Sequence, residues 1–340
     1  MTGRKSFGSD NHAGAHPEVL AAIAAANAGD AHPYGADDVS ARVAAELREA
    51  FGAADAFLVF NGSAANVLGV SLLVRPFDAI ICAETSHLNV DECGATERVL
   101  GNKLLTVATP DGKLTPELVK TRLTGRNDEH RAQPRVVEIT QATELGTCYS
   151  LDELGRLSEF CRSEGLALYM DGARLANSAV YLDCDLAELG RHVDVLSFGG
   201  TKNGGVAAEA VIVMRDELVA NVPFLRKQQL QLASKMRFMA AQFGALLDDK
   251  LWWRSAQHSN AMAQRLAAGL ADAEGVRISY PVQSNAVFAA LSPERIRALQ
   301  REWTFYMWDE RESIVRWMTA FDTTEEDVDA FLASILASGG

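Results

Sequence analysis

Short apolar segments alternate with helix-forming segments between residues 56 and 198, and this alternation is the feature that most constrains the fold. Strands that alternate with helices favour a mostly parallel sheet with helices on both faces, so we predict an α/β fold. The apolar segment 210–214 follows the last of these strands so closely that we expect it to run antiparallel. The expected strands are residues 56–60, 79–82, 135–140, 166–170 and 194–198.

The pattern changes after residue 215, where the chain predicts a second, smaller α+β domain. We expect a large domain over residues 1–250, which includes the N-terminal segment, and a small domain over residues 251–340. The elements expected in this part are a long helix at 228–272, strands at 274–278, 286–291 and 313–318, and helices at 293–303 and 324–337.

One lysine stands in a loop of small residues directly after the strand 194–198. Gly199 and Gly200 precede Lys202, and Gly204 and Gly205 follow it. Glycine lets the backbone approach a ligand closely, and a desolvated lysine can lose its proton and attack a carbonyl group. The alternative is a surface turn that happens to carry a lysine, and the loop alone does not decide between the two.

The strand 166–170 ends in an acid, Asp171, which Gly172, Ala173 and Arg174 follow. An acid at the carboxyl end of a strand can pair with a protonated ring nitrogen, and pyridoxal phosphate acts as an electron sink only while its ring nitrogen keeps that proton. A helix N-cap is the alternative role for Asp171. A third motif, Asn61–Asn66, opens a helix with Gly62 and Ser63 and suits a phosphate group.

Together these motifs resemble those of the pyridoxal-phosphate-dependent threonine aldolases of the β-eliminating lyase group, in the aspartate-aminotransferase fold superfamily. The resemblance implies fold type I, with a three-layer large domain and a small C-terminal domain. It also implies aldol cleavage of L-β-hydroxy-α-amino acids, such as threonine, allo-threonine and phenylserine, to glycine and an aldehyde. The matching segments are Phe7–Asn11, Pro33–Asp38, Asn61–Asn66, Ser86-His87 with Glu92, Asp171–Arg174, Thr201-Lys202 and Ser313–Arg316.

The resemblance implies a role for each cofactor-binding residue. Lys202 would bind pyridoxal phosphate covalently, Asp171 would pair with the ring nitrogen, and His87 would stack on the ring. Gly62 and Ser63 would hold the phosphate through backbone and hydroxyl donors. These roles make Lys202, His87 and Asp171 the expected catalytic residues, and no metal site is predicted.

The resemblance also implies the residues that bind the substrate. Arg316 and Ser9 would hold the substrate carboxylate, because a guanidinium group offers two parallel donors. Arg174 would support the carboxylate or the phenolic oxygen of the cofactor, with a structural ion pair to Asp171 as the alternative. Tyr34 would serve the active site of an adjacent subunit.

The group that removes the proton of the β-hydroxyl is left open by the sequence. Many family members carry a histidine near the substrate hydroxyl, and Gln141 stands at the corresponding position here, in a loop that looks longer. The candidate bases are His87, a water molecule held near Gln141, and Glu92. Gln141 is therefore also expected to contact the substrate.

Composition indicates a soluble enzyme without nucleic acid or membrane as a partner, because the formal net charge is −13. Five cysteines without paired spacing suggest reduced thiols in the cytoplasm, and no secretion signal is expected. The basic residues Arg226, Lys227 and Arg237 form either a solvated helix face or, as the resemblance implies, contacts to the cofactor phosphate of a neighbouring subunit. We expect a homodimer or homotetramer with shared active sites.

Other functions use the same lysine and aspartate. A different fold-type-I lyase or an aminotransferase acting on a small amino acid remains an alternative, as does a catalytically silent protein of this fold. The Asp-Gly-Ala-Arg segment at residues 171–174 together with Ser86-His87 favours the aldolase branch.

Overall fold

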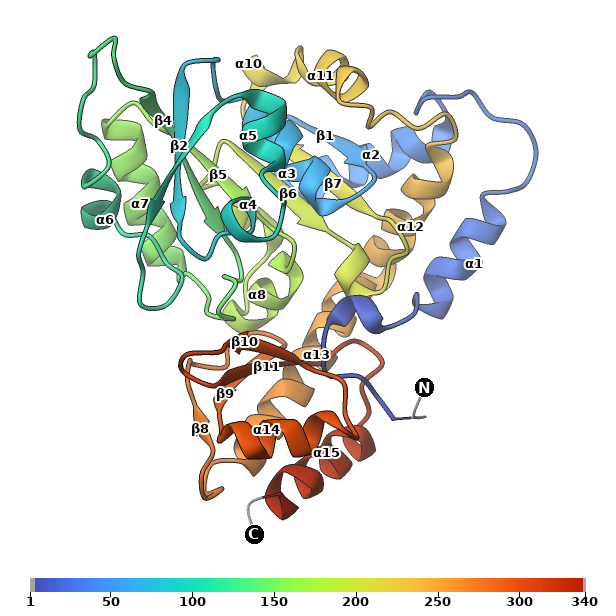
Figure 1. Ribbon diagram of the computed structural model, residues 1–340. Coiled ribbons are helices and arrows are strands. Elements are labelled where there is room, and N and C mark those ends of the chain that lie inside the picture. Colours follow the sequence, from blue (N-terminus) through green and yellow to red (C-terminus); the bar gives the residue numbers. More distant parts are fainter. Residues whose placement is uncertain (1–3, 339–340) are drawn as a thin grey trace.

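The computed structural model describes residues 4–338 and contains a seven-stranded sheet with the strand order β1-β7-β6-β5-β4-β2-β3 (Figure 1). Strands β2 to β6 pair in parallel, whereas β7 runs antiparallel to both β6 and β1, as predicted. The strands are β1 Asp55–Val59, β2 Asp78–Ala83, β3 Lys103–Val107, β4 Gln133–Thr140, β5 Ala167–Asp171, β6 Val195–Gly199 and β7 Glu209–Val213.

Helices cover both faces of this sheet and give the large domain its three layers. Side chains alternate along the central strands, so that Ile80 packs into one apolar core and Ile81 into the other. One face is covered by α2 Asp38–Phe51, α7 Leu151–Ser163, α8 Leu175–Leu182, α9 Leu186–Gly190 and α12 Arg237–Leu247. The other is covered by α3 Gly62–Ser71, α4 His87–Val90, α5 Ala95–Leu100 and α11 Val222–Gln228.

A second, antiparallel sheet with the order β10-β11-β9-β8 forms the small domain below the first (Figure 1). Its elements are β8 Arg277–Ile278, β9 Ala286–Ala290, β10 Tyr306–Asp309, β11 Ile314–Met318, α14 Pro293–Gln300 and α15 Glu325–Ala337. Phe7 lies in the core of this domain, where its ring stacks on Phe331 with the centroids 4.3 Å apart. The part of the N-terminal segment around Phe7 therefore packs against the small domain, although the expected large domain includes it, whereas α1 Pro17–Ala25 packs against α12 of the large domain.

The long helix expected at 228–272 is divided in the structure. Residues 229–236 form a loop, α12 follows, and α13 Leu251–Gly269 begins only after a short turn. Asp249 and Lys250 adopt the left-handed conformation, with φ values of 44° and 50°, and this produces a kink between the two helices. Helix α13 then extends from the core of the large domain into that of the small domain.

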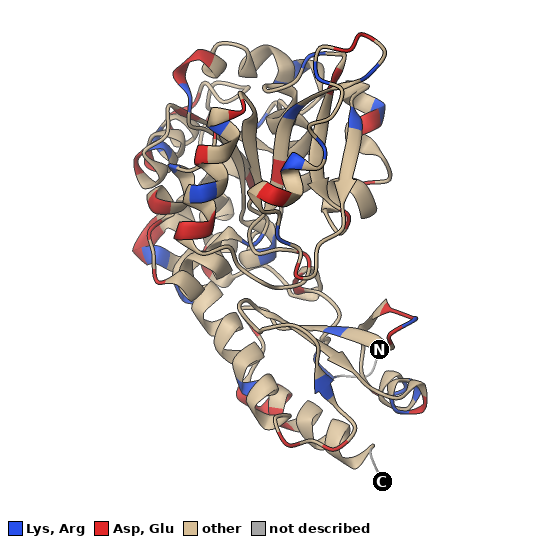
Figure 2. Ribbon diagram, turned by 90° about the vertical axis from the view of Figure 1, so that its left-hand side faces the viewer, with Lys and Arg blue, Asp and Glu red and all other residues tan. Residues whose placement is uncertain are grey.

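Charged residues are distributed over the outer helices of both domains, and acidic and basic residues are interspersed (Figure 2). Helix α13, which joins the domains, carries only Arg254 and Arg265 among its side chains of fixed charge. Within residues 4–338, no helix has the length and apolar character needed to cross a bilayer.

Candidate active site

The predicted lysine and aspartate lie at the carboxyl ends of two neighbouring parallel strands. Asp171 is the last residue of β5, and Lys202 lies in the short helical turn Thr201–Asn203 that follows β6. The two loops approach closely because glycine leaves room between them. A Cβ atom on Gly172 would lie 2.0 Å from the backbone oxygen of Ser197, which no side chain could tolerate.

The pKa of Lys202 is lowered, first because the amine is buried and second because Arg174 lies near. The carboxylates of Asp10, Asp171 and Glu209 oppose this shift. A lowered pKa increases the share of neutral amine at a given pH, and the neutral amine is the form that attacks a carbonyl carbon.

Both carboxylate oxygens of Asp171 are held by the protein. Oδ1 accepts a hydrogen bond from the backbone N–H of Ala173 at 2.8 Å, and Oδ2 accepts one from the side-chain amide of Asn66 at 2.7 Å. Helix α8 begins at Leu175 and has no side-chain cap, so Asp171 is not its N-cap. The carboxylate is instead fixed in the site, with Oδ2 able to accept a further donor.

His87 begins the short helix α4 and forms a pair with Glu92. Its Nδ1 donates to Glu92 Oε1 at 2.9 Å, and its backbone N–H donates to Glu144 Oε1 at 2.9 Å. The imidazole is 33% exposed while Glu92 is fully buried, so Nε2 is the nitrogen left for a ligand. The hydrogen bond to Glu92 raises the pKa of His87 against the effect of burial.

Arg174 forms its ion pair with Asp10, not with the expected alternative Asp171. Nε and Nη2 of Arg174 donate to the two carboxylate oxygens of Asp10 at 2.8 and 3.0 Å. Asp10 also accepts a hydrogen bond at 3.1 Å from Asn285 of the small domain. Burial would raise the pKa of Asp10, but Arg174 outweighs burial and lowers it to about 2.

Arg316 enters the same region from β11 of the small domain. Its Nη2 donates to the backbone oxygen of Gly8 at 3.4 Å, and its guanidinium lies 5.4 Å from the ring centre of Trp308. Nε of Arg316 is buried and has no hydrogen-bond partner among residues 4–338. Ser9, next to Gly8, accepts the backbone N–H of Asn11 at 3.2 Å. Arg316 thus retains donor capacity for an anion.

Gly62 and Ser63 form the first turn of α3, after the N-cap Asn61. The side chain of Asn61 accepts the N–H of Ala64 at 2.9 Å. The amides of Gly62 and Ser63 precede the first helical hydrogen bonds and point toward the helix N-terminus, where an anion is favoured. The structure therefore has the helix N-terminus that the sequence predicted at Gly62 and Ser63.

The surroundings of Gln141 differ from those expected for a residue that contacts the substrate. It is completely buried, and its side-chain amide exchanges two hydrogen bonds with the backbone of Tyr149, at 2.9 and 3.0 Å. Both polar atoms of the amide therefore have partners within the protein, and the side chain has no exposed surface. The carboxyls of Glu144 and Glu138 lie in the same strand-end region, and burial raises the pKa of Glu144 to about 7 and that of Glu138 well above its ordinary value.

The predicted contacts to a second subunit lie on the surface of this chain. Tyr34 is 49% exposed, and Nζ of Lys227 lies 5.1 Å from the centre of its ring. Arg226 is partly buried and donates at 3.4 Å to a backbone carbonyl of β1. Arg237 donates at 3.0 Å to a backbone carbonyl of the loop before Tyr34. Lys227 is thus exposed beside Tyr34, whereas the two arginines have intramolecular contacts.

Three residues of the site were not singled out from the sequence as functional: Asp10, Asn66 and Glu209. Asp10 falls inside the N-terminal motif but shows its role only through its pairing with Arg174. Asn66 lies one helical turn after Gly62, which is the spacing that brings two residues to the same face of a helix. Glu209 is buried on β7, and burial raises its pKa to about 7.

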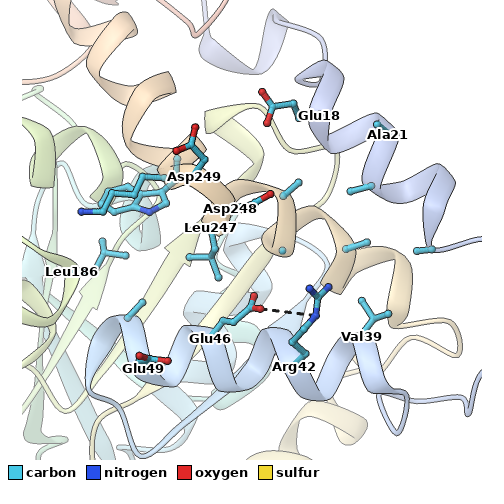
Figure 3. A pocket seen from close by; sticks show the side chains of 18 of the residues that line it. Glu18, Ala21, Val39, Arg42, Glu46, Glu49, Leu186, Leu247, Asp248 and Asp249 are labelled. Atoms are coloured by element: carbon cyan, nitrogen blue, oxygen red, sulfur yellow. Dashed lines mark ion pairs between the residues drawn. The ribbon is translucent and has the colours of Figure 1, made fainter.

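A separate hollow lies between α1 Pro17–Ala25, α2 and α12 (Figure 3). Its lining combines small apolar side chains with carboxylates, and Arg42 pairs with Glu46 across 3.9 Å. None of the predicted site residues lines it. The hollow is therefore not the site that the strand ends form.

A sequence model described as beta-eliminating lyase matches residues 6–292. The chain belongs to the beta-eliminating lyase family. The prediction of a pyridoxal-phosphate-dependent lyase, made from the motifs, is thereby confirmed, and so is the fold expected for it.

Within the beta-eliminating lyase family, this chain is similar over its length to threonine aldolases. It is 44% identical to the low specificity L-threonine aldolase of Pseudomonas aeruginosa, with 95% of each chain covered. It is 43% identical to the low specificity L-threonine aldolase of a Pseudomonas species, covering 98% of this chain and 97% of that one. The solved threonine aldolase of Leishmania major superposes with a TM-score of 0.92 at 34% identity, covering 97% and 98% of the two chains.

Proposed function

We propose that this protein cleaves L-β-hydroxy-α-amino acids, including threonine, allo-threonine and phenylserine-like compounds, into glycine and an aldehyde. The observation that carries the proposal is the arrangement of Lys202 and Asp171 at adjacent strand ends, with Arg174 and Arg316 near them. The identity of 44% to a low specificity L-threonine aldolase supports this choice of reaction.

The residues present fit pyridoxal phosphate. Lys202 is a buried amine with a lowered pKa, and Asp171 Oδ2 has Asn66 as its one side-chain donor among residues 4–338, which leaves room for a ring N–H. The first turn of α3, with Gly62 and Ser63, would hold the phosphate. When bound, the cofactor supplies an electron-poor ring that accepts the electron pair released at the substrate Cα.

Arg316, Arg174 and Ser9 hold the substrate carboxylate in this proposal. The Nε of Arg316 is buried without a partner, and Asp10 fixes the guanidinium of Arg174 through two of its nitrogens, so that the third remains available. Holding the carboxylate in one place orients the Cα–Cβ bond. Such alignment contributes to the rate because the breaking bond must face the electron acceptor.

His87 takes the proton of the β-hydroxyl. Its Nε2 has no hydrogen-bond partner among residues 4–338 while Glu92 holds Nδ1, whereas Glu92 itself is buried and Gln141 is hydrogen-bonded to the backbone. Because Glu92 raises the pKa of His87 above the usual 6.5, the basic form of the imidazole predominates only at a correspondingly higher pH. The value of kcat/KM should therefore rise with pH through this raised pKa.

We also propose a cytoplasmic homodimer, or a tetramer built from it, in which each site uses residues of both subunits. The exposed pair Tyr34 and Lys227 supports this arrangement, because an exposed aromatic ring beside a cation suits an interface with an anionic group. The absence of disulfides among Cys82, Cys93, Cys148, Cys161 and Cys184 is consistent with a reducing compartment.

Aldehyde release from a panel of L- and D-β-hydroxy-α-amino acids tests the reaction. We expect release from the L-isomers only, with glycine as the second product. Lys202→Ala should abolish both aldehyde release and the visible absorbance of bound cofactor. Formation of a keto acid without glycine would instead support an aminotransferase, and a protein that remains colourless after addition of pyridoxal phosphate would contradict the cofactor.

Mixing two inactive variants tests the shared site. If the subunits share the site, Lys202 and Lys227 of any one site belong to different chains. Lys202→Ala and Lys227→Ala then inactivate a site through different subunits. A hybrid dimer then has one intact site, so random mixing should restore about a quarter of wild-type activity. No recovery in hybrids that have demonstrably formed would contradict a shared site.

A further inference from the structure

We propose that Asn66 is a positioning residue that holds both Glu92 and Asp171 through its single amide group. It thereby connects the partner of His87 with the acid expected to pair with the cofactor ring. Its Nδ2 donates to Glu92 Oε1 at 2.9 Å and to Asp171 Oδ2 at 2.7 Å. The inference rests on the proposed function, in which Asp171 faces the cofactor ring and His87 faces the substrate.

The amide group of Asn66 can serve both carboxylates because it has two N–H donors. Asn66 is 1% exposed, so no water competes for these donors. A serine or threonine has one donor and could hold only one carboxylate. An aspartate would have none in its ionised form and would place three carboxylates in contact.

The orientation of the amide is itself fixed by the protein. Its Oδ1 accepts the hydroxyl of Tyr169 at 2.8 Å, and the hydroxyl of Ser197 lies at 3.4 Å. The ring of Tyr169 packs on α3 where Gly69 has no side chain, since a Cβ atom there would lie 2.4 Å from the ring. With Oδ1 occupied by a donor, Nδ2 must face the two carboxylates.

One carboxylate oxygen connects this amide to the imidazole. Glu92 Oε1 accepts both the Asn66 amide and Nδ1 of His87, while Glu92 Oε2 is buried and has no partner among residues 4–338. Removing Asn66 would release the Glu92 carboxylate to rotate away from the imidazole. The same change would release Oδ2 of Asp171 from the place where the ring nitrogen is expected.

Two titrations measure the effect of Asn66, one on Asp171 and the other on the Glu92–His87 pair. The first is the pH dependence of the absorbance of the bound cofactor in the holoenzyme, which responds to the acid beside the ring. The second is the pKa of His87, measured by NMR on the same protein and assigned with His87→Asn. The groups that face His87 are Glu92, Asp171 and Lys202 by their charge, and Glu144 at its backbone N–H.

We expect Asn66→Ala to shift both titrations. The absorbance midpoint should move in the same direction as in Asp171→Asn, and the pKa of His87 should fall as in Glu92→Gln, each by at least about half a pH unit. Asn66→Leu should reproduce both shifts, because its side chain is similar in size and lacks the two donors. The KM should change less than kcat, since the substrate carboxylate is held elsewhere.

Asn102→Ala is the matched control. Asn102 is 2% exposed and its amide also donates two hydrogen bonds, to the backbone oxygens of Arg75 and Asp78, but it lies outside the site. This variant should lose stability without shifting either titration. Unchanged titrations in Asn66→Ala, or a shift at one end only, would overturn the proposal. Failure of aldehyde release in the wild type would instead count against the proposed reaction, because both titrations are independent of substrate.

Discussion

Asp10 and Arg174 form a two-pronged ion pair that connects the N-terminal segment to the loop after β5, at 2.8 and 3.0 Å. The side chain of Asp10 is 1% exposed and that of Arg174 is 16% exposed. Asn285 donates to the same carboxylate, so that one acid fixes the guanidinium and also contacts the small domain. The pair therefore orients the arginine that we propose to bind the substrate carboxylate, and it connects the N-terminal segment with both domains.

Replacing Asp10 with Asn should destabilise the protein by about 3–5 kcal/mol, because the buried arginine would lose its charge partner. Urea denaturation at neutral pH measures this change. The KM for the amino acid should also rise, since Arg174 would no longer be held. A variant with unchanged stability and unchanged KM would show that the pair has neither effect.

The stabilising effect of Asp10 should depend on pH in the acid range. The carboxyl has a pKa of about 2 in the folded protein and of 3.8 as its ordinary value. Its contribution is therefore complete above about pH 3.8 and is lost as the pH falls toward 2. The difference in unfolding free energy between wild type and Asp10→Asn should shrink over this interval.

The contribution of Glu144 to stability should depend on pH in the opposite direction. Burial raises the pKa of its carboxyl from 4.5 to about 7, so the folded protein keeps a proton that the unfolded chain releases. Stability should then fall as the pH rises from about 4.5 to 7. Glu144→Gln should lack that fall and exceed the wild type by about 1–3 kcal/mol at pH 8. Urea titrations at pH 5 and pH 8 compare the two proteins, and parallel curves would contradict the expectation.

Gly172→Ala should disrupt the junction between β5 and β6. The added Cβ atom would lie 2.0 Å from the Ser197 oxygen, and a backbone atom cannot move aside as a side chain can. We expect a loss of about 3 kcal/mol or more, together with weaker cofactor binding as Asp171 is displaced. Thermal unfolding and cofactor titration measure the two effects.

Gly155→Ala provides the comparison for this glycine. Gly155 lies within α7, and its nearest neighbour would be the His192 ring at 3.6 Å, an ordinary contact. Alanine is favoured over glycine in a helix by up to about 1 kcal/mol, so this variant should be unchanged or slightly more stable. Equal losses in both variants would rule out steric contact as the cause.

Phe7→Ala should unfold the small domain at a lower denaturant concentration. The ring of Phe7 is fully buried and stacks on Phe331, so its removal should cost about 3–5 kcal/mol. Phe77→Ala is the control, because that ring is 56% exposed. Equal stability of the two variants would indicate that the N-terminal segment does not support the small-domain core.

Local motifs predicted the part of the site that lies on strand ends. Asp171 and Lys202 were predictable because the carboxyl ends of adjacent parallel strands meet at one edge of the sheet. The partner of Arg174 was not predictable, because Asp10 comes from a distant segment whose position depends on the small domain. Gln141 shows a related limit: its position in the motif indicated a substrate contact, but the loop folds back on Tyr149 and occupies its amide.

The fold shows the same difference between features that local sequence predicts and features that depend on packing. Alternating apolar segments predicted the sheet, and the short distance between β6 and β7 predicted their antiparallel pairing. The break between α12 and α13 was missed because Asp249 and Lys250, not glycine or proline, adopt the left-handed conformation there. Residues with weak turn signals can interrupt a helix when the packing on both sides requires it.

Helix α13 connects the two domains as one continuous helix. Leu251, Trp252 and Ala256 anchor one end in the large core, and Met262 and Leu266 anchor the other end in the small core. A continuous helix resists bending, so α13 restricts how the small domain can move relative to the large domain. Arg316 lies in the small domain and Arg174 in the large one, so the stiffness of this helix limits changes in the distance between the two guanidinium groups that we propose to bind one carboxylate.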